Sequence, residues 1–135
     1  TCGWVPRGWK TDDGPAPWLA EFGCSEHTSR QYAPRTVANV RMAHTLVWFG
    51  HDNSPGGKLT LATAHDEKIS ILVVAFPLTP PAPYEQFGDL VTACFLRNEF
   101  KRTPADVLMI AGNREATNPG IGAFVELVLT EALKP

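Results

Sequence analysis

The stretch Asn53–Thr60 has the residue types of an anion-binding turn between a strand and a helix. Its two adjacent glycines let the backbone approach a ligand closely. The serine before them can cap a helix, and the proline suits the first helical turn. Unpaired N–H groups of such a turn, together with the helix dipole, favour a negatively charged group. We therefore predict a phosphate or oxyanion seat formed by Ser54, Gly56, Gly57, Lys58 and Thr60.

The segments around this turn alternate between strand-like and helix-like patterns. The predicted strands are 1–8, 45–50, 69–76 and 106–111, and the predicted helices are 29–44, 59–68, 84–100 and 121–133. The run 69–76 is nearly all apolar, which is typical of a strand covered on both faces. We expect an irregular excursion over 9–22 and a stiff proline-rich connection over 77–83. The alternation predicts an α/β fold with a mainly parallel sheet, in a single domain spanning residues 1–135.

Polar and glycine-bearing segments follow the predicted strands. Ligands bind outside the carboxyl ends of the strands in such sheets, and these ends are followed by 6–8, 50–58, 76–79 and 112–120. We predict that the first segment forms the near rim of the site and the last forms its second wall. The residues concerned are Gly3, Pro6 and Gly8 for the rim, and Gly112, Arg114, Glu115 and Gly120 for the wall.

Each charged or amide candidate also has a structural interpretation. Arg114 could grip a phosphate through its planar fork, with Glu115 holding a ribose hydroxyl or orienting Arg114, or the two could form a local ion pair that fixes the loop. Arg35 and Asn39 are four residues apart and share one face of their helix. They could face the ligand or tie the helix to the loops. Lys58 could meet the anion or remain a solvated surface lysine.

Composition excludes several classes of partner. The net charge is -2 and no basic block is present, so duplex nucleic acid is not an expected ligand. No apolar run approaches the roughly 20 residues that span a bilayer. The three cysteines are odd in number and widely spaced, which indicates reduced thiols in a cytoplasmic protein. Cys24 and His27 form a single close pair, whereas a zinc site needs four ligands, so no metal site is expected. His51 follows a predicted strand and is the histidine to test in proton transfer.

Four motifs in order resemble a known family. They are Gly3-Trp4-Val5-Pro6-Arg7-Gly8 with Asp13-Gly14-Pro15-Ala16-Pro17, Tyr32-x-x-Arg35-Thr36-x-x-Asn39-Val40-Arg41, Pro55-Gly56-Gly57-x-x-Thr60, and Ala111-Gly112-Asn113-Arg114-Glu115-x-x-x-Pro119-Gly120-Ile121. Together they resemble the putative molybdenum-carrier family, a branch of the SLOG-like, Rossmann-type nucleotide-binding proteins, over nearly the whole chain. The resemblance implies a Rossmann-like three-layer fold, a nucleotide-like ligand or a molybdopterin-type cofactor, and a homo-oligomer.

The resemblance departs from the family pattern at the start of the chain. Members usually begin with a strand and a Gly-Gly-Gln-Thr-Gly-type loop that leads into a helix. This sequence starts after that unit, so roughly 30 residues, by the size of a βαβ half, are expected to be absent. Either the sequence is a trimmed fragment, or the protein lacks one wall of its site. A truncated site would bind its ligand more weakly, or a partner chain would complete it.

A related family offers an enzymatic alternative. Nucleoside-monophosphate phosphoribohydrolases of the lysine-decarboxylase-like group carry Pro-Gly-Gly-x-Gly-Thr-x-x-Glu, and here Thr63 stands at the position of the catalytic Glu. Cleavage of an N-glycosidic bond needs a carboxylate to stabilise the ribosyl cation or activate water. We therefore expect a binding protein with a carrier or sequestering role. The alternative is a nucleotide-processing enzyme that hydrolyses an N-glycosidic or phosphate bond.

Overall fold

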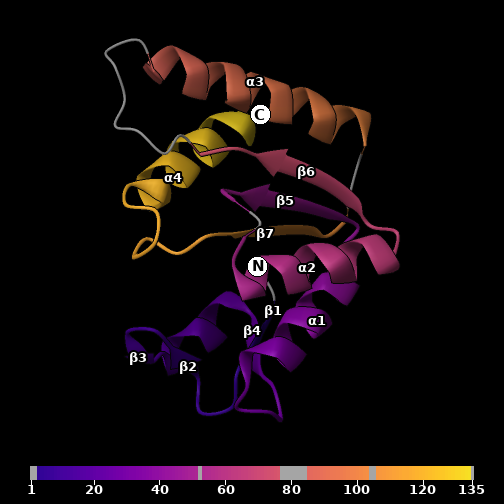
Figure 1. The fold of residues 1–135 in the computed structure, drawn as a ribbon, viewed down its shortest axis with the longest axis vertical. Coiled ribbons are helices and arrows are strands. Elements are labelled where there is room, and N and C mark those ends of the chain that lie inside the picture. Colours follow the sequence, from indigo (N-terminus) through magenta and orange to yellow (C-terminus); the bar gives the residue numbers. More distant parts are fainter. Residues whose placement is uncertain (1–2, 52, 77–84, 104–105, 135) are drawn as a thin grey trace.

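The computed structural model describes residues 3–51, 53–76, 85–103 and 106–134. Helices and strands alternate along most of this chain (Figure 1). In order they are β1 Gly3–Val5, β2 Lys10–Thr11, β3 Gly14–Pro15, the 3-10 helix η1 Pro17–Phe22, β4 Cys24–Glu26, α1 Tyr32–Met42, β5 Thr45–Phe49, α2 Pro55–Asp66, β6 Ser70–Val74, α3 Glu85–Arg102, β7 Leu108–Gly112 and α4 Ile121–Ala132.

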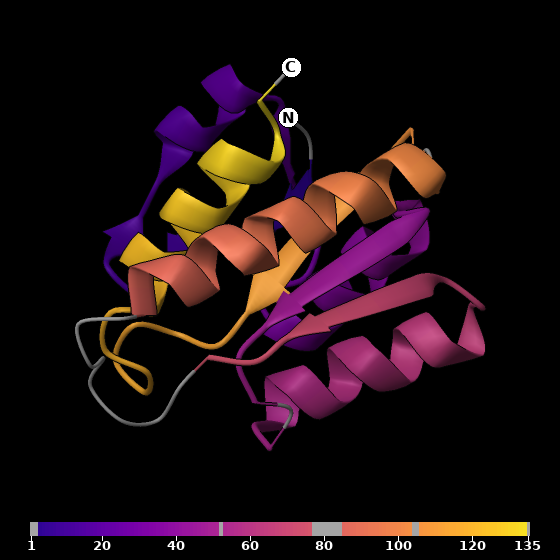
Figure 2. The ribbon, with the colours of Figure 1, turned by 90° about the horizontal axis from the view of Figure 1, so that it is seen from above.

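The main sheet has three parallel strands in the order β6-β5-β7. Thr45 of β5 lies opposite Ser70 of β6 and Leu108 of β7, and the pairing continues to the carboxyl ends of all three strands. α3 and α4 cover one face of this sheet, while α1 and α2 lie on the other (Figures 1 and 2). The predicted α/β fold with a mainly parallel sheet in three layers is confirmed.

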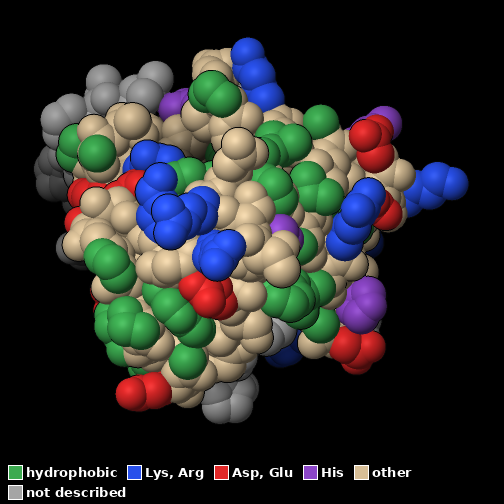
Figure 3. All heavy atoms as spheres, turned by 90° about the horizontal axis from the view of Figure 1, so that it is seen from below, with side chains coloured by type: hydrophobic (Ala, Val, Ile, Leu, Met, Phe, Trp, Pro, Cys, Tyr) green, Lys and Arg blue, Asp and Glu red, His purple; other side chains and the backbone are tan. Residues whose placement is uncertain are grey.

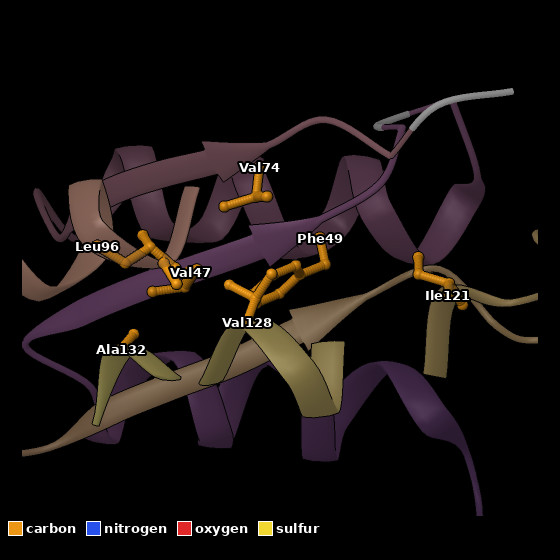
Figure 4. Close-up of a cluster of buried hydrophobic side chains, with 8 residues drawn as sticks. Val47, Phe49, Val74, Leu96, Ile121, Val128 and Ala132 are labelled. Atoms are coloured by element: carbon orange, nitrogen blue, oxygen red, sulfur yellow. The ribbon is translucent and has the colours of Figure 1, made fainter. Parts of the chain in front are cut away.

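Strand β5 builds both cores because all of its residues are buried. Side chains alternate between the faces of a strand, so Val47 and Phe49 point toward α3 and α4, whereas Leu46 packs with Val40 and Ala64 on the opposite face. Figure 4 shows the first cluster, in which Val47, Phe49 and Val74 of the sheet meet side chains of α3 and α4. Trp48 must therefore face the layer of α1 and α2.

Three expectations about the chain need correction. β1 does not join the main sheet, because it pairs in parallel with β4, with Gly3 opposite Cys24. The segment predicted to be irregular contains the hairpin β2–β3 and the helix η1. Val73 of β6 is 62% exposed, so this edge strand is not covered on both faces. The predicted connection 77–83 lies outside the described residues.

Candidate functional site

A cavity of about 980 Å³ lies between α1, the start of α2 and β7. We call it the α1–β7 cavity. Trp48 of the central strand β5 lines the cavity, and so do residues of the loop after β7. It is lined by Tyr32, Arg35, Thr36, Asn39, Trp48, Ser54, Pro55, Gly56, Gly57, Thr60, residues 106–113, Arg114 and Thr117. The predicted turn and the first residues of the predicted second wall thus meet in one cavity, which runs along the whole of β7 and past its carboxyl end.

The predicted cap of α2 is present. The Gly57 N–H donates to Ser54 Oγ over 3.0 Å, and the Lys58 N–H donates to the Ser54 carbonyl over 2.9 Å. Pro55 has no N–H. The N–H groups of Gly57 and Lys58 are already paired with Ser54, so they are not free to bind an anion, and other groups must contribute to the seat.

The cap gives a first testable prediction. Replacing Ser54 by Ala removes the acceptor of the Gly57 N–H and should lower the free energy of unfolding by about 1 kcal/mol, as measured by urea denaturation. Ser54→Asp keeps an acceptor at the helix N-terminus and should retain most of the stability. An Ala variant as stable as the wild type would show that the cap does not hold this turn.

Two of the predicted residues have structural partners. Asn39 ties α1 to β1, because its Nδ2 donates to the Trp4 carbonyl over 3.1 Å and its Oδ1 accepts the Trp4 N–H over 2.6 Å. Thr60 Oγ1 donates to the Gly56 carbonyl over 2.8 Å. Both residues line the α1–β7 cavity. For Asn39 the structure shows the tie between helix and neighbouring segment that was one of its two interpretations.

Three side-chain polar atoms in the lining are buried without a hydrogen-bond partner. They are Arg35 Nε, Trp48 Nε1 and Asn113 Oδ1. Buried polar atoms are nearly always paired in folded proteins, so each unpaired atom needs an explanation. Two donors and one acceptor are thus unpaired in residues that line a single cavity.

Asn113 is held firmly in this arrangement. Its backbone N–H donates to the Phe49 carbonyl over 3.0 Å, and its Nδ2 donates to Asn118 Oδ1 over 2.8 Å. Gly50 makes room for it, since a Cβ there would lie 2.9 Å from Asn113 Cγ and the glycine has a φ of +104°. The loop after β7 is therefore fixed against the end of β5 by an amide that also lines the cavity.

Three cations surround the ring of Tyr32 at the side of the cavity. Lys10 Nζ, Arg35 Cζ and Arg114 Cζ lie 5.0, 5.5 and 5.8 Å from the ring centroid. Asp12 joins them, with Oδ2 3.2 Å from Arg114 Nη1 and Oδ1 accepting a 3.4 Å hydrogen bond from the Tyr32 hydroxyl. We call this group the Tyr32 cluster. Figure 3 shows Lys and Arg side chains gathered on this face beside Asp and Glu.

Burial makes Arg35 the most constrained of these cations. Desolvation lowers its pKa, and Arg114 lowers it further, while Tyr32 and Asp12 act in the opposite direction. A guanidinium remains charged in proteins because its ordinary pKa is very high. Arg35 is thus a charged group with an unpaired donor in a partly desolvated place, where an anion would be favourable.

Glu115 makes two hydrogen bonds that the sequence did not predict. Its Oε1 accepts the Gly120 N–H over 2.5 Å and its Oε2 accepts the Gly122 N–H over 2.9 Å. These bonds place a carboxylate at the N-terminus of α4 and lower the pKa of Glu115. Arg114 pairs with Asp12, so the proposed ion pair between Arg114 and Glu115 does not form in this structure.

The lowered pKa of Glu115 predicts a pH dependence of stability. Because the folded-state pKa lies below the ordinary value of 4.5, the stabilising effect is present above that value and disappears as the pH falls through the folded-state pKa. Between about pH 5 and pH 3 the wild type should therefore lose more stability than Glu115→Gln. Urea denaturation at each pH measures this difference, and equal losses in the two proteins would contradict it.

Six predicted site residues lie outside the lining of the cavity. Gly3, Pro6 and Gly8 belong to the β1 segment, whose short sheet is separate from the main one. The remaining three are Lys58, Glu115 and Gly120. The other eight predicted residues come together in the lining, namely Arg35, Asn39, Ser54, Gly56, Gly57, Thr60, Gly112 and Arg114.

Sequence reasoning did not identify several residues of the site. Trp48 lies within a predicted apolar strand, and nothing in that pattern indicates that its indole N–H is unpaired. Lys10 and Asp12 lie in a stretch that was expected to be irregular. Asn113 stood inside a quoted motif, and its place after a predicted strand was the signal that could have found it.

Two features are absent from the described residues. No group of three His, Cys, Asp or Glu side chains there is arranged to hold a metal ion. No helix in the described part of the chain combines the length and apolar character that crossing a bilayer requires.

Comparison with known proteins places the chain in a family. The model of the circularly permutated YpsA SLOG family matches residues 1–133. The crystal structure of a putative molybdenum carrier protein from Syntrophus aciditrophicus SB is similar over 98% of this chain and 78% of that chain, with 24% identity and a TM-score of 0.80, which shows a shared fold. A search of curated proteins gave no match. The resemblance found in the sequence motifs is confirmed, and the chain belongs to the circularly permutated YpsA SLOG family.

Proposed function

We propose that the chain binds a phosphate-bearing small molecule in the α1–β7 cavity and acts as a carrier or sequestering protein. The observation that supports this most is the position of Arg35. Arg35 lines the cavity and its Nε is buried without a hydrogen-bond partner, while its guanidinium lies beside Tyr32 together with Lys10 and Arg114. Arginine forks match the geometry of phosphate oxygens. The cavity therefore offers a charged seat that the protein itself satisfies only in part.

The remainder of the cavity suits the organic part of such a ligand. Trp48 and Asn113 line the cavity, and each has a buried side-chain polar atom without a hydrogen-bond partner: the indole N–H of Trp48 and the amide oxygen of Asn113. Met109 and Ile110 of β7 add apolar lining. A heterocycle with both donor and acceptor groups could use these features, and nucleotides and molybdopterin-type cofactors both combine a heterocycle with a phosphate. The carrier name of the similar structure fits the second of these ligands.

A non-catalytic role is supported by the position of Thr63. This residue occupies the place of the catalytic Glu in phosphoribohydrolases, and its hydroxyl donates to the Leu59 carbonyl over 2.7 Å within α2. Thr63 is not among the residues that line the cavity. We also propose a cytoplasmic location, where free thiols such as Cys24 and Cys94 stay reduced. Homo-oligomerisation stays a prediction of the resemblance.

Native mass spectrometry of the purified protein tests this function. We expect a retained mass that matches a phosphate-bearing ligand, or saturable uptake of added AMP, with the ligand recovered unchanged. Conversion of AMP during incubation would favour the nucleotide-processing enzyme instead. Neither a retained ligand nor saturable binding of AMP at millimolar concentration would contradict the proposal.

A further inference from the structure

The tip of the β2–β3 hairpin reaches into the Tyr32 cluster. Lys10 pairs with Pro15 and Thr11 pairs with Gly14, so Asp12 and Asp13 form the two-residue loop between the strands. Thr11 Oγ1 also donates to the Gly14 carbonyl over 2.6 Å. The short loop gives the carboxylate of Asp12 a defined position.

Asp12 contacts two residues that line the α1–β7 cavity without lining it itself. Its Oδ2 lies 3.2 Å from Arg114 Nη1, and its Oδ1 accepts from the Tyr32 hydroxyl over 3.4 Å. A carboxylate thus occupies one side of a group that otherwise contains Lys10, Arg35 and Arg114 around one ring. The Asp12 carboxylate is an anion beside these cations, which is the position that a ligand phosphate would take.

The contact is of a kind that a ligand can replace. The side chains of Asp12 and Arg114 are 54% and 63% exposed, and exposed ion pairs are weak. A phosphomonoester carries up to two negative charges and three strong acceptor oxygens, against one charge on a carboxylate. It can therefore compete for Arg114 while also engaging Arg35, which Asp12 leaves with an unpaired Nε.

We propose that Asp12 is an internal competitor for the anion seat, which a phosphomonoester displaces from Arg114 when it binds. This inference rests on the proposed function. It makes Asp12 a specificity-determining residue, because any anion must first displace a tethered carboxylate that is already in place. Weakly charged or singly charged anions are thereby disfavoured relative to a phosphomonoester.

Asp12→Asn tests this role, with AMP as the probe in isothermal titration calorimetry at one fixed, low ionic strength. Removing the competing charge should tighten AMP binding by about three- to tenfold. Asp13→Asn is the matched control, since it makes the same change of charge at the adjacent loop position. It should change the affinity for AMP less than twofold, because a surface charge that contacts none of the three cations is screened by solvent and salt. Thermal denaturation of both variants establishes that they are folded.

A double variant tests whether Asp12 acts through Arg114. In an Arg114→Met background, Asp12→Asn should no longer tighten AMP binding, because the two residues act through one contact. If the wild type binds AMP but Asp12→Asn binds it no more tightly than Asp13→Asn, the inference is overturned while the proposed function stands. If none of these proteins binds AMP and the purified protein retains no phosphate-bearing ligand, both are overturned; a retained ligand replaces AMP as the probe.

Discussion

Replacing Arg35 by Met should weaken the binding of AMP by about 10- to 100-fold, because a charged hydrogen-bond partner contributes about 1.5–3 kcal/mol. The methionine keeps much of the aliphatic packing but removes a guanidinium that lines the cavity and whose Nε is buried without a hydrogen-bond partner. Among the three cations of the Tyr32 cluster, Arg35 is the one with such an atom. Isothermal titration calorimetry measures the change in affinity.

The same helix provides the control for this experiment. Arg41 of α1 pairs with Glu67 over 2.7 Å, has a largely exposed side chain and does not line the cavity. Arg41→Met should therefore bind AMP within about twofold of the wild type, since a distant exposed charge is screened. Equal losses in the two variants would show that net charge, and not the seat at Arg35, governs binding.

Replacing Gly57 by Ala should lower the free energy of unfolding by about 1–3 kcal/mol relative to replacing Gly56 by Ala, because the added methyl group overpacks a filled site. A Cβ on Gly57 would lie 2.9 Å from Trp48 Cζ2 and 3.1 Å from Ser54 Oγ, whereas a Cβ on Gly56 would meet nothing within 4 Å. Both variants gain the same helix propensity, so the difference between their free energies of unfolding reports the contact of the new methyl group with Trp48 and Ser54. Urea denaturation of the two proteins measures this difference.

The pair of glycine variants also reports on the cavity. Trp48 lines it and is buried, so the ring has little freedom to move away from a new methyl group. Gly56→Ala by itself should be as stable as the wild type or stabilised by up to about 1 kcal/mol. If Gly57→Ala proved as stable as Gly56→Ala, Trp48 would not pack closely on this turn. The assignment of Trp48 to the wall of the cavity would then be contradicted as well.

Local sequence signals were sufficient for the main elements of the fold. The apolar run of β5 predicted a strand because all of its side chains are buried, and Ser54 with Pro55 predicted the start of α2 because capping depends on adjacent residues. The helical spacing that predicted α4 matches the contacts of Ile121 and Val128 with the core. These signals are short-range, so the sequence exposes them directly.

Long-range contacts account for what the sequence did not predict. Pairing of β1 with β4 joins short strands that lack an apolar pattern, so neither strand indicates its partner. Asp12 reaches Arg114 across a distance in sequence that no spacing rule covers. Glu115 was expected to act on a ligand or on Arg114, but its short loop brings it back to the N–H groups at the start of α4. Such roles depend on the folded geometry.

The side-chain NMR signals of Trp48 and Arg35 test the central claim most directly. The chain has four tryptophans, of which Trp48 lines the cavity and has a buried indole N–H without a hydrogen-bond partner. On titration with AMP, we predict saturable shifts of the Trp48 Nε1–H and Arg35 Nε–H signals, while the indole signals of Trp4, Trp9 and Trp18 remain in place. Saturable binding of AMP that leaves the Trp48 and Arg35 signals unchanged would contradict the assignment of this cavity as the ligand site.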